Sequence, residues 1–183
     1  YQEKFYNGVI SNFIDSYANA ETPVPCIKCN QTVKFTDLLN ESKNLNADTL
    51  VTGHYAIRKG GLKNSKLFKA KDLKKDQSYF LFATLQDQLD YVRFPLGEYL
   101  KSEIRKMAEQ FQLVVSDKPD SQDICFVTSD SYRNLIDNIN PEINKEGNIF
   151  DLNGNVIGRH KGISNYTVGQ RKGIGVGGQQ KPL

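Results

Sequence analysis

Tryptophan is absent from the chain of 183 residues, methionine occurs once, and cysteine occurs only three times. Three cysteines are few and cannot all pair with one another, so a disulfide framework is not expected. This favours a reducing compartment. No apolar run approaches the ~20 residues of a membrane helix, and the first residues do not resemble a signal peptide. These absences exclude a disulfide-stapled secreted domain and a membrane span, so the sequence predicts a cytoplasmic protein.

Charge is unevenly distributed, although the net charge is only +3. Between positions 59 and 75 the single acidic residue is Asp72, against seven lysines at 59, 63, 66, 69, 71, 74 and 75. A second basic group consists of Arg159, His160, Lys161, Arg171 and Lys172. Segregated cations interleaved with glycine and aromatic residues are typical of proteins that bind a polyanion. A solvated lysine-rich loop explains the first group equally well.

Apolar periodicity predicts an α/β fold. Residues 1–18 form an amphipathic helix with a buried row at Phe5, Val9, Phe13 and Tyr17. Pro23 and Pro25 then predict an extended segment, and a second helix begins at or just after Asn30 and buries Phe35, Leu38, Leu39 and Leu45. A short strand at 47–55 ends in Thr-Gly-His-Tyr. Helix, strand and polar turn in this order are typical of a doubly wound sheet, which binds ligands at the carboxyl ends of its strands.

The rest of the chain predicts further elements and a change of character near residue 129. Asp76 caps a helix that runs through Phe82, and residues 102–112 form a helix that buries Ile104, Met107, Ala108 and Phe111. A short strand follows at 113–115. A helix at 131–139 precedes a hairpin of strands 148–151 and 156–159, with Asn-Gly at its turn. We therefore place a domain boundary between residues 128 and 129.

The pair Cys26-x-x-Cys29 has three interpretations. A zinc site needs two more ligands, and no second pair has suitable spacing. A thioredoxin-like dithiol does not suit the prolines that precede it. The third interpretation makes Cys29 a nucleophile, because unsatisfied N–H groups at the start of a helix and the charge of Lys28 favour its thiolate.

Other candidate residues lie in loops. Cys125 stands between Ile124 and Phe126, which predicts partial burial and a raised thiol pKa; a persulfide carried there would be more nucleophilic than the thiol. His54 follows Gly53 at the end of the first strand and suits contact with a nucleotide or base. Lys75, Asp76 and Gln77 open a helix beside the lysines, a position that suits phosphate or base contacts. Each of these residues also has a purely structural explanation.

An ordered series of segments resembles the tRNA-specific 2-thiouridylase family, which makes 2-thiouridine at the tRNA wobble position. The series covers nearly the whole chain: TPVPCIKCN at 22–30, KF at 34–35, AD at 47–48, TGHY at 52–55, KDQSYFL at 75–81, FPLG at 94–97, RKMA at 105–108, DSQDICF at 120–126 and residues 167–178. The chain departs from a common pattern at Val24 and Cys26, where many members carry Asn and Asp.

The resemblance implies a role for each matching residue. Cys29 matches the catalytic nucleophile and Cys125 the cysteine that carries the persulfide. Gly53 matches a nucleotide-binding position, and His54 a position that contacts tRNA. Lys75, Asp76 and Gln77 match a further tRNA-contacting stretch, whereas the segment around the target base corresponds to Val24, Pro25 and Cys26.

The resemblance also implies a fold. Residues 1–128 correspond to the second half of an adenine-nucleotide α-hydrolase-like domain of the PP-loop ATP pyrophosphatase type. Residues 129–183 correspond to a truncated small α+β central domain. On this basis we expect an interior fragment, inactive alone, which lacks a preceding ATP-binding loop and a following β-barrel.

The implied chemistry is ATP-dependent sulfur transfer. ATP, with magnesium, adenylates the uridine at carbon 2, and sulfur from a Cys125 persulfide replaces the oxygen, leaving a Cys29–Cys125 disulfide. The expected partners are tRNA and a sulfur-relay or cysteine desulfurase donor protein. We expect a monomeric enzyme without a structural metal. Two alternatives are a non-catalytic basic module that binds tRNA and a domain stabilised by zinc on Cys26 and Cys29.

Overall fold

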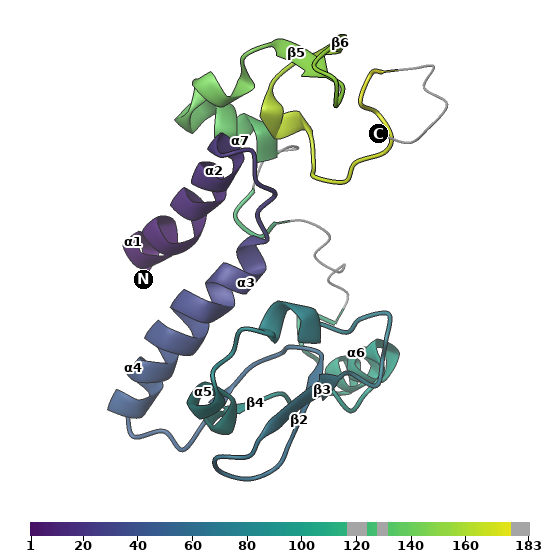
Figure 1. Cartoon of the computed structure of the whole chain (residues 1–183). Coiled ribbons are helices and arrows are strands. Elements are labelled where there is room, and N and C mark those ends of the chain that lie inside the picture. The colour runs from purple at the N-terminus through teal and green to yellow at the C-terminus, as the bar shows by residue number, and fades with distance from the viewer. Residues whose placement is uncertain (117–123, 128–131, 177–183) are drawn as a thin grey trace. The chain divides into compact units, whose positions relative to one another are not determined.

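The structure is a computed structural model that describes residues 1–116, 124–127 and 132–176 (Figure 1). Contacts divide the chain into two compact units. The first contains Tyr1–Gly8 and Cys26–Ser121, and the second contains Val9–Pro25 and Gln122–Leu183. The two units are not divided by a single boundary, because residues 9–25 belong to the second one. The assignment of residues 1–128 and 129–183 to two domains stays a prediction.

The first eighteen residues are helical, as the apolar spacing predicts. α1 (Gln2–Phe5) continues through a π-helical turn, η1 (Tyr6–Ile10), into α2 (Ser11–Ala18). The predicted apolar row is buried from its second member onward, at Val9, Phe13 and Tyr17. Ala20, with φ of +58°, follows the end of α2.

The second helix begins earlier than predicted. α3 (Pro25–Cys29), the π-helical η2 (Asn30–Leu38) and α4 (Leu39–Asn44) form one uninterrupted helical stretch, because Cys29 itself has helical angles (φ −59°, ψ −43°). The expectation of a start at Asn30 and of an extended Pro25 is therefore wrong. Proline suits the first helical position, where its missing N–H needs no partner. Phe35 and Leu39 are buried as predicted, whereas Leu45 is 73% exposed.

The first unit contains two small sheets. β1 (Leu50–Val51) pairs in parallel with β4 (Val92–Arg93), and β2 (Ala56–Lys59) pairs antiparallel with β3 (Lys66–Lys69). The first part of the lysine-rich stretch, up to Lys69, is therefore a hairpin, whereas residues 70–75 form neither helix nor strand. A single core joins the helices to these sheets and consists of Phe35, Leu39, Ala56, Leu81, Leu89, Val92 and Phe94.

Three helices complete the first unit: the 3-10 helix η3 (Ser78–Leu81), α5 (Gln86–Tyr91) and α6 (Lys101–Gln110). α6 confirms the predicted helix at 102–112, but not its predicted burial. Ile104, Met107 and Ala108 are only partly buried, and Phe111 is 74% exposed. The predicted strand at 113–115 is wrong, because Gln112 has φ of +52° and Val114 is 99% exposed in a turn. β4, not these residues, is the parallel partner of β1.

The second unit combines helices with one hairpin. α7 (Tyr132–Ile139) and the 3-10 helices η4 (Pro141–Asn144) and η5 (Ile163–Asn165) accompany β5 (Gly147–Phe150) and β6 (Val156–His160). Its core gathers Phe13, Ile14, Tyr17, Ile136 and Ile143. α7 and the Asn-Gly hairpin are confirmed, although Ser131 lies outside the described residues.

Candidate functional site

A cavity of about 450 Å³ lies at the carboxyl end of β1 in the first unit. Three residues predicted for the site line it, namely Gly53, His54 and Gln77; the rest of the lining is Lys34, Leu38, Leu50, Val51 and Thr52. Chain positions more than twenty residues apart are thus brought together where a parallel pair of strands ends, the usual location of ligands in such sheets. Sequence reasoning gave no role to Lys34, whose only signal was its place in the segment Lys34-Phe35.

His54 is a neutral side chain at physiological pH. Burial, together with the nearby charge of Lys34, lowers its pKa from 6.5 to about 4. Its Nδ1 lies 2.9 Å from the hydroxyl of Thr52, and its ring packs edge-on against Phe94 at 6.0 Å between centroids. The imidazole can therefore exchange hydrogen bonds with a ligand, but it offers no positive charge to a phosphate.

The segment from Lys75 to Gln77 is tied firmly to its surroundings. Gln77 accepts a hydrogen bond from the Tyr55 backbone N–H (2.9 Å) and donates its own N–H to the Tyr55 carbonyl (2.8 Å). Asp76 accepts hydrogen bonds from the Ala70 N–H (2.7 Å) and the Ser78 hydroxyl (2.8 Å). The N-cap of the 3-10 helix is Gln77, one position later than predicted, although Asp76 contacts the first residue of that helix. The Lys75 side chain is exposed.

The two thiols of the first unit lie within the first helical turns after Pro25. Cys26 is exposed and Cys29 is partly exposed, and both are thiols. The sequence predicted Cys29 at the start of a helix. Because the helix begins at Pro25, Cys29 lies four residues after that start. The unsatisfied N–H groups of the first turn are closer to Cys26. Residues three apart in a helix share a face, so Cys26 and Cys29 lie on the same side of it.

Asn30 follows Cys29 and is buried, with only 2% of its surface exposed. Its Nδ2 donates a hydrogen bond of 2.9 Å to the carbonyl of Phe80. Its Oδ1 accepts none from the residues that the structure describes. This side chain connects the helix that carries Cys29 with the helix that follows Gln77.

Cys125 lies in a turn of the second unit and is exposed. The expectation of partial burial is wrong, because its two neighbours point into the core instead. Ile124 and Phe126 pack against the core of that unit, and the Phe126 ring lies edge-on to Phe13 at 5.5 Å. A thiol held at the surface by two anchored apolar residues is accessible to other reactants.

Val24 and Pro25, expected beside a target base, differ in exposure. Val24 is 38% exposed, whereas Pro25 is buried. No structural observation assigns either residue a ligand, so their role stays a prediction.

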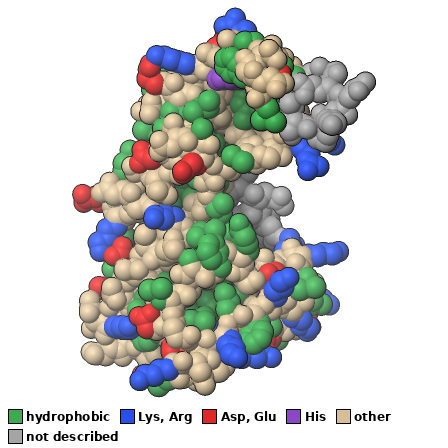
Figure 2. Space-filling view, in the orientation of Figure 1, with side chains coloured by type: hydrophobic (Ala, Val, Ile, Leu, Met, Phe, Trp, Pro, Cys, Tyr) green, Lys and Arg blue, Asp and Glu red, His purple; other side chains and the backbone are tan. Residues whose placement is uncertain are grey.

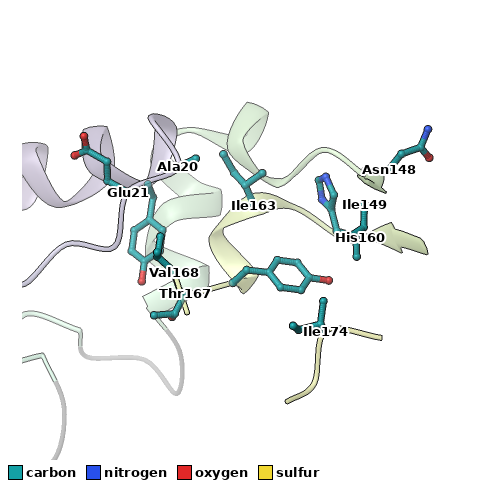
Figure 3. A pocket seen from close by; sticks show the side chains of 11 residues that line it. Ala20, Glu21, Asn148, Ile149, His160, Ile163, Thr167, Val168 and Ile174 are labelled. Atoms are coloured by element: carbon teal, nitrogen blue, oxygen red, sulfur yellow. The ribbon is translucent and has the colours of Figure 1, made fainter. Parts of the chain in front are cut away.

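A second hollow, of about 340 Å³, belongs to the second unit (Figure 3). His160 and Tyr166 form an edge-on pair at 6.1 Å within it; Glu21 contributes from the loop after α2 and Ile163 from η5. His160 Nδ1 accepts a hydrogen bond of 3.1 Å from the Gly162 N–H, which leaves its proton on Nε2. None of the residues predicted for the site lines this hollow.

The described residues contain no group of three His, Cys, Asp or Glu side chains that could hold a metal ion. No helix in the described part of the chain is long and apolar enough to cross a membrane.

Comparisons with known proteins identify the family. Residues 1–129 match the profile described as tRNA methyl transferase HUP domain, and residues 134–183 match the tRNA methyl transferase PRC-barrel domain. These matches confirm an α/β class for the first part.

Similar curated proteins carry the name tRNA-specific 2-thiouridylase MnmA. One from Ehrlichia canis is 53% identical over 98% of this chain and 49% of its own length. Those from Rickettsia prowazekii and Rhodospirillum centenum are each 51% identical, over 96% and 100% of this chain and 49% and 46% of their own lengths. The chain thus spans about half the length of these relatives. It belongs to the tRNA methyl transferase HUP domain family and, within it, to the MnmA proteins.

Proposed function

We propose that the protein of which this chain is part transfers sulfur to carbon 2 of the tRNA wobble uridine, giving 2-thiouridine. The observation that carries the proposal is the identity of 51–53% with MnmA proteins over 96–100% of the chain. The arrangement of the first unit supports it, because a cavity at the end of β1 gathers Gly53, His54 and Gln77.

The cavity at the end of β1 is our proposed site for part of ATP. Gly53 is exposed, and a Cβ there would meet only Leu96, at 3.7 Å, so its backbone can approach a ligand closely. Lys34 supplies a cation at the rim for phosphate. When bound, ATP, accompanied by magnesium, supplies the AMP group that makes the uridine 2-oxygen a leaving group. In this assignment residues 1–128 are part of a PP-loop type of domain, and residues 129–183 are part of a small central domain.

The two cysteines carry the sulfur. Cys125 holds the sulfane sulfur as a persulfide, and this terminal sulfur forms the new bond to carbon 2 while the activated oxygen leaves. Cys29 attacks Cys125 Sγ, so the two thiols become a disulfide while the sulfane sulfur is reduced to the level of sulfide. A dithiol reductant then restores both thiols. Exposure of Cys125 suits loading by a cysteine desulfurase or sulfur-relay protein.

The remaining predicted residues contact RNA in this proposal. Lys75, Asp76 and Gln77 face the tRNA from the start of η3, and neutral His54 offers a hydrogen bond. Val24, Pro25 and Cys26 surround the target base. A monomer in the cytoplasm suits this substrate.

Nucleoside mass spectrometry tests the proposal. The full-length gene product is incubated with tRNA, ATP and a sulfur donor, and 2-thiouridine is measured after digestion. We expect product with the wild type and a loss of at least about 100-fold with Cys29→Ser or Cys125→Ser, because each removes a reacting sulfur. Cys26→Ser is expected to have a milder effect. Absence of 2-thiouridine with the wild type, or full activity of both variants, would contradict the proposal.

A further inference from the structure

The outer face of the β2–β3 hairpin carries an unusual set of side chains. Lys59 lies directly opposite Lys66, and Ile57 lies opposite Phe68. Side chains two apart on a strand share a face, so Lys59, Lys66 and Phe68 form one surface. Both lysines are exposed, and Phe68 is 45% exposed. On the opposite face Ala56 and Leu67 pack against the core, whereas Lys69 at the end of β3 is exposed.

This arrangement does not help the hairpin to fold. Like charges directly opposite each other destabilise an antiparallel pair, and an exposed phenylalanine gains little from burial. Among the described residues, neither Lys59 nor Lys66 has an ion-pair partner. An anionic ligand that lies between the two ammonium groups would relieve their repulsion.

The hairpin is held rigidly in spite of its surface composition. The buried Asp90 accepts hydrogen bonds from the backbone N–H groups of Lys63 (2.6 Å) and Ser65 (3.3 Å) near the tip. Arg58 donates to the carbonyls of Leu89 (3.1 Å) and Gly60 (3.0 Å). The strand positions of Lys59 and Lys66 are therefore fixed before any ligand arrives, unlike those of a solvated loop.

A hollow of about 320 Å³ adjoins this face at Ile57, the partner of Phe68. It is lined by Val51, Ile57, Arg58, Arg93, Phe94, Pro95 and Glu98. All seven lysines of the stretch from 59 to 75 are exposed, and Figure 2 shows Lys and Arg side chains close to hydrophobic ones in the lower part of the view. An exposed aromatic ring next to a pair of lysines, beside a hollow that two arginines help to line, matches the stacking platforms that bind unpaired nucleotides.

We propose that this face, made of Lys59, Lys66 and Phe68, binds an unpaired stretch of the tRNA substrate. One base stacks on Phe68, and the phosphates on the side of the hairpin tip lie on Lys59 and Lys66. The inference rests on the proposed function for the identity of the RNA, and it adds a contact surface on β2 and β3, separate from the cavity at the end of β1.

Salt-dependent binding of tRNA to the full-length gene product tests the proposal. Removing one cation that neutralises a phosphate of a single strand makes the slope of log affinity against log salt shallower by ~0.7. The double variant Lys59→Ala/Lys66→Ala is expected to make the slope shallower by about 1.4 and to unfold at no lower temperature than the wild type. Lys106→Ala, which removes an exposed lysine from α6, is the charge control and should leave the slope unchanged.

The aromatic ring is tested separately. Phe68→Ala is expected to weaken tRNA binding at least about fivefold with an unchanged salt slope, and Phe68→Tyr should stay within about twofold of the wild type. An unchanged slope in the double lysine variant, or equal affinities of Phe68→Ala and Phe68→Tyr, would overturn the proposal. So would lysine variants that bind tRNA normally but accept sulfur only from a small-molecule persulfide, since this face would then serve a donor protein. If the salt slopes change as expected but the full-length gene product forms no 2-thiouridine, the proposed function is refuted, whereas the proposal that this face binds tRNA is still supported.

Discussion

Asn30 shows how one buried amide can organise the surroundings of a reactive thiol. It follows Cys29 directly, and its hydrogen bond to the Phe80 carbonyl spans fifty positions of sequence. Its unpaired Oδ1 lowers stability, since a buried acceptor without a partner loses its hydration. The arrangement fixes the orientation of the helix at Cys29.

Replacing Asn30 by Ala leaves the Phe80 carbonyl without its donor. We expect the free energy of unfolding to fall by about 1–3 kcal/mol, measured by urea denaturation of the full-length gene product. Asn40→Ala, at an exposed position of α4, is the matched control and should change it by less than about 0.5 kcal/mol. Equal effects of the two changes would show that the buried bond does not hold the helix.

His54 predicts a pH dependence of stability. Its pKa falls from 6.5 to about 4 on folding, mainly through burial. Below pH 6.5 His54 is therefore protonated in the unfolded chain, whereas in the folded chain it becomes protonated only near pH 4. Stability should decrease as the pH falls between these values, by up to about 3 kcal/mol from this group. His54→Gln should lose that part of the slope in urea denaturation from pH 4 to 7; parallel curves for both proteins would refute the assignment.

Single elements follow from the sequence where local chemistry decides them. The helix at 1–18 and the hairpin around Asn153-Gly154 were both predictable, because apolar spacing and turn residues act over a few positions. The start of α3 was misplaced, since Pro25 is compatible with an extended chain and with a first helical position. β4 and α5 were not predicted, because a strand of two residues and a helix of six residues depend on tertiary contacts.

The β5–β6 turn provides a test at the level of one element. Gly154 has φ of +84°, and a Cβ there would meet no atom within 4 Å, so only the backbone conformation opposes substitution. Gly154→Ala is expected to destabilise the hairpin by about 1 kcal/mol, whereas Gly154→Asn should recover much of the loss, because Asn tolerates this region. Thermal unfolding compares the two; identical midpoints would show that the turn relaxes.

At the scale of the whole molecule, the sequence predicted which helices and strands are present better than which of them pack into the same unit. Residues 9–25 belong with the C-terminal half, and no local pattern reveals this. Of the candidate site, Gly53, His54 and Gln77 do meet in one cavity, as the rule for strand ends suggests. The exposure of Cys125 could not be predicted, because Ile124 and Phe126 are apolar in either case and only the fold decides which way they point.

The early start of the helix at Pro25 has a consequence for the reactivity of its two thiols. Cys26 and Cys29 share one helical face, and side chains at this spacing have Cβ atoms ~5–6 Å apart. One arsenic(III) atom can bridge two sulfurs at such a separation. Phenylarsine oxide should therefore add once to this pair, detectable as a single mass increment that disappears when either residue is replaced by serine.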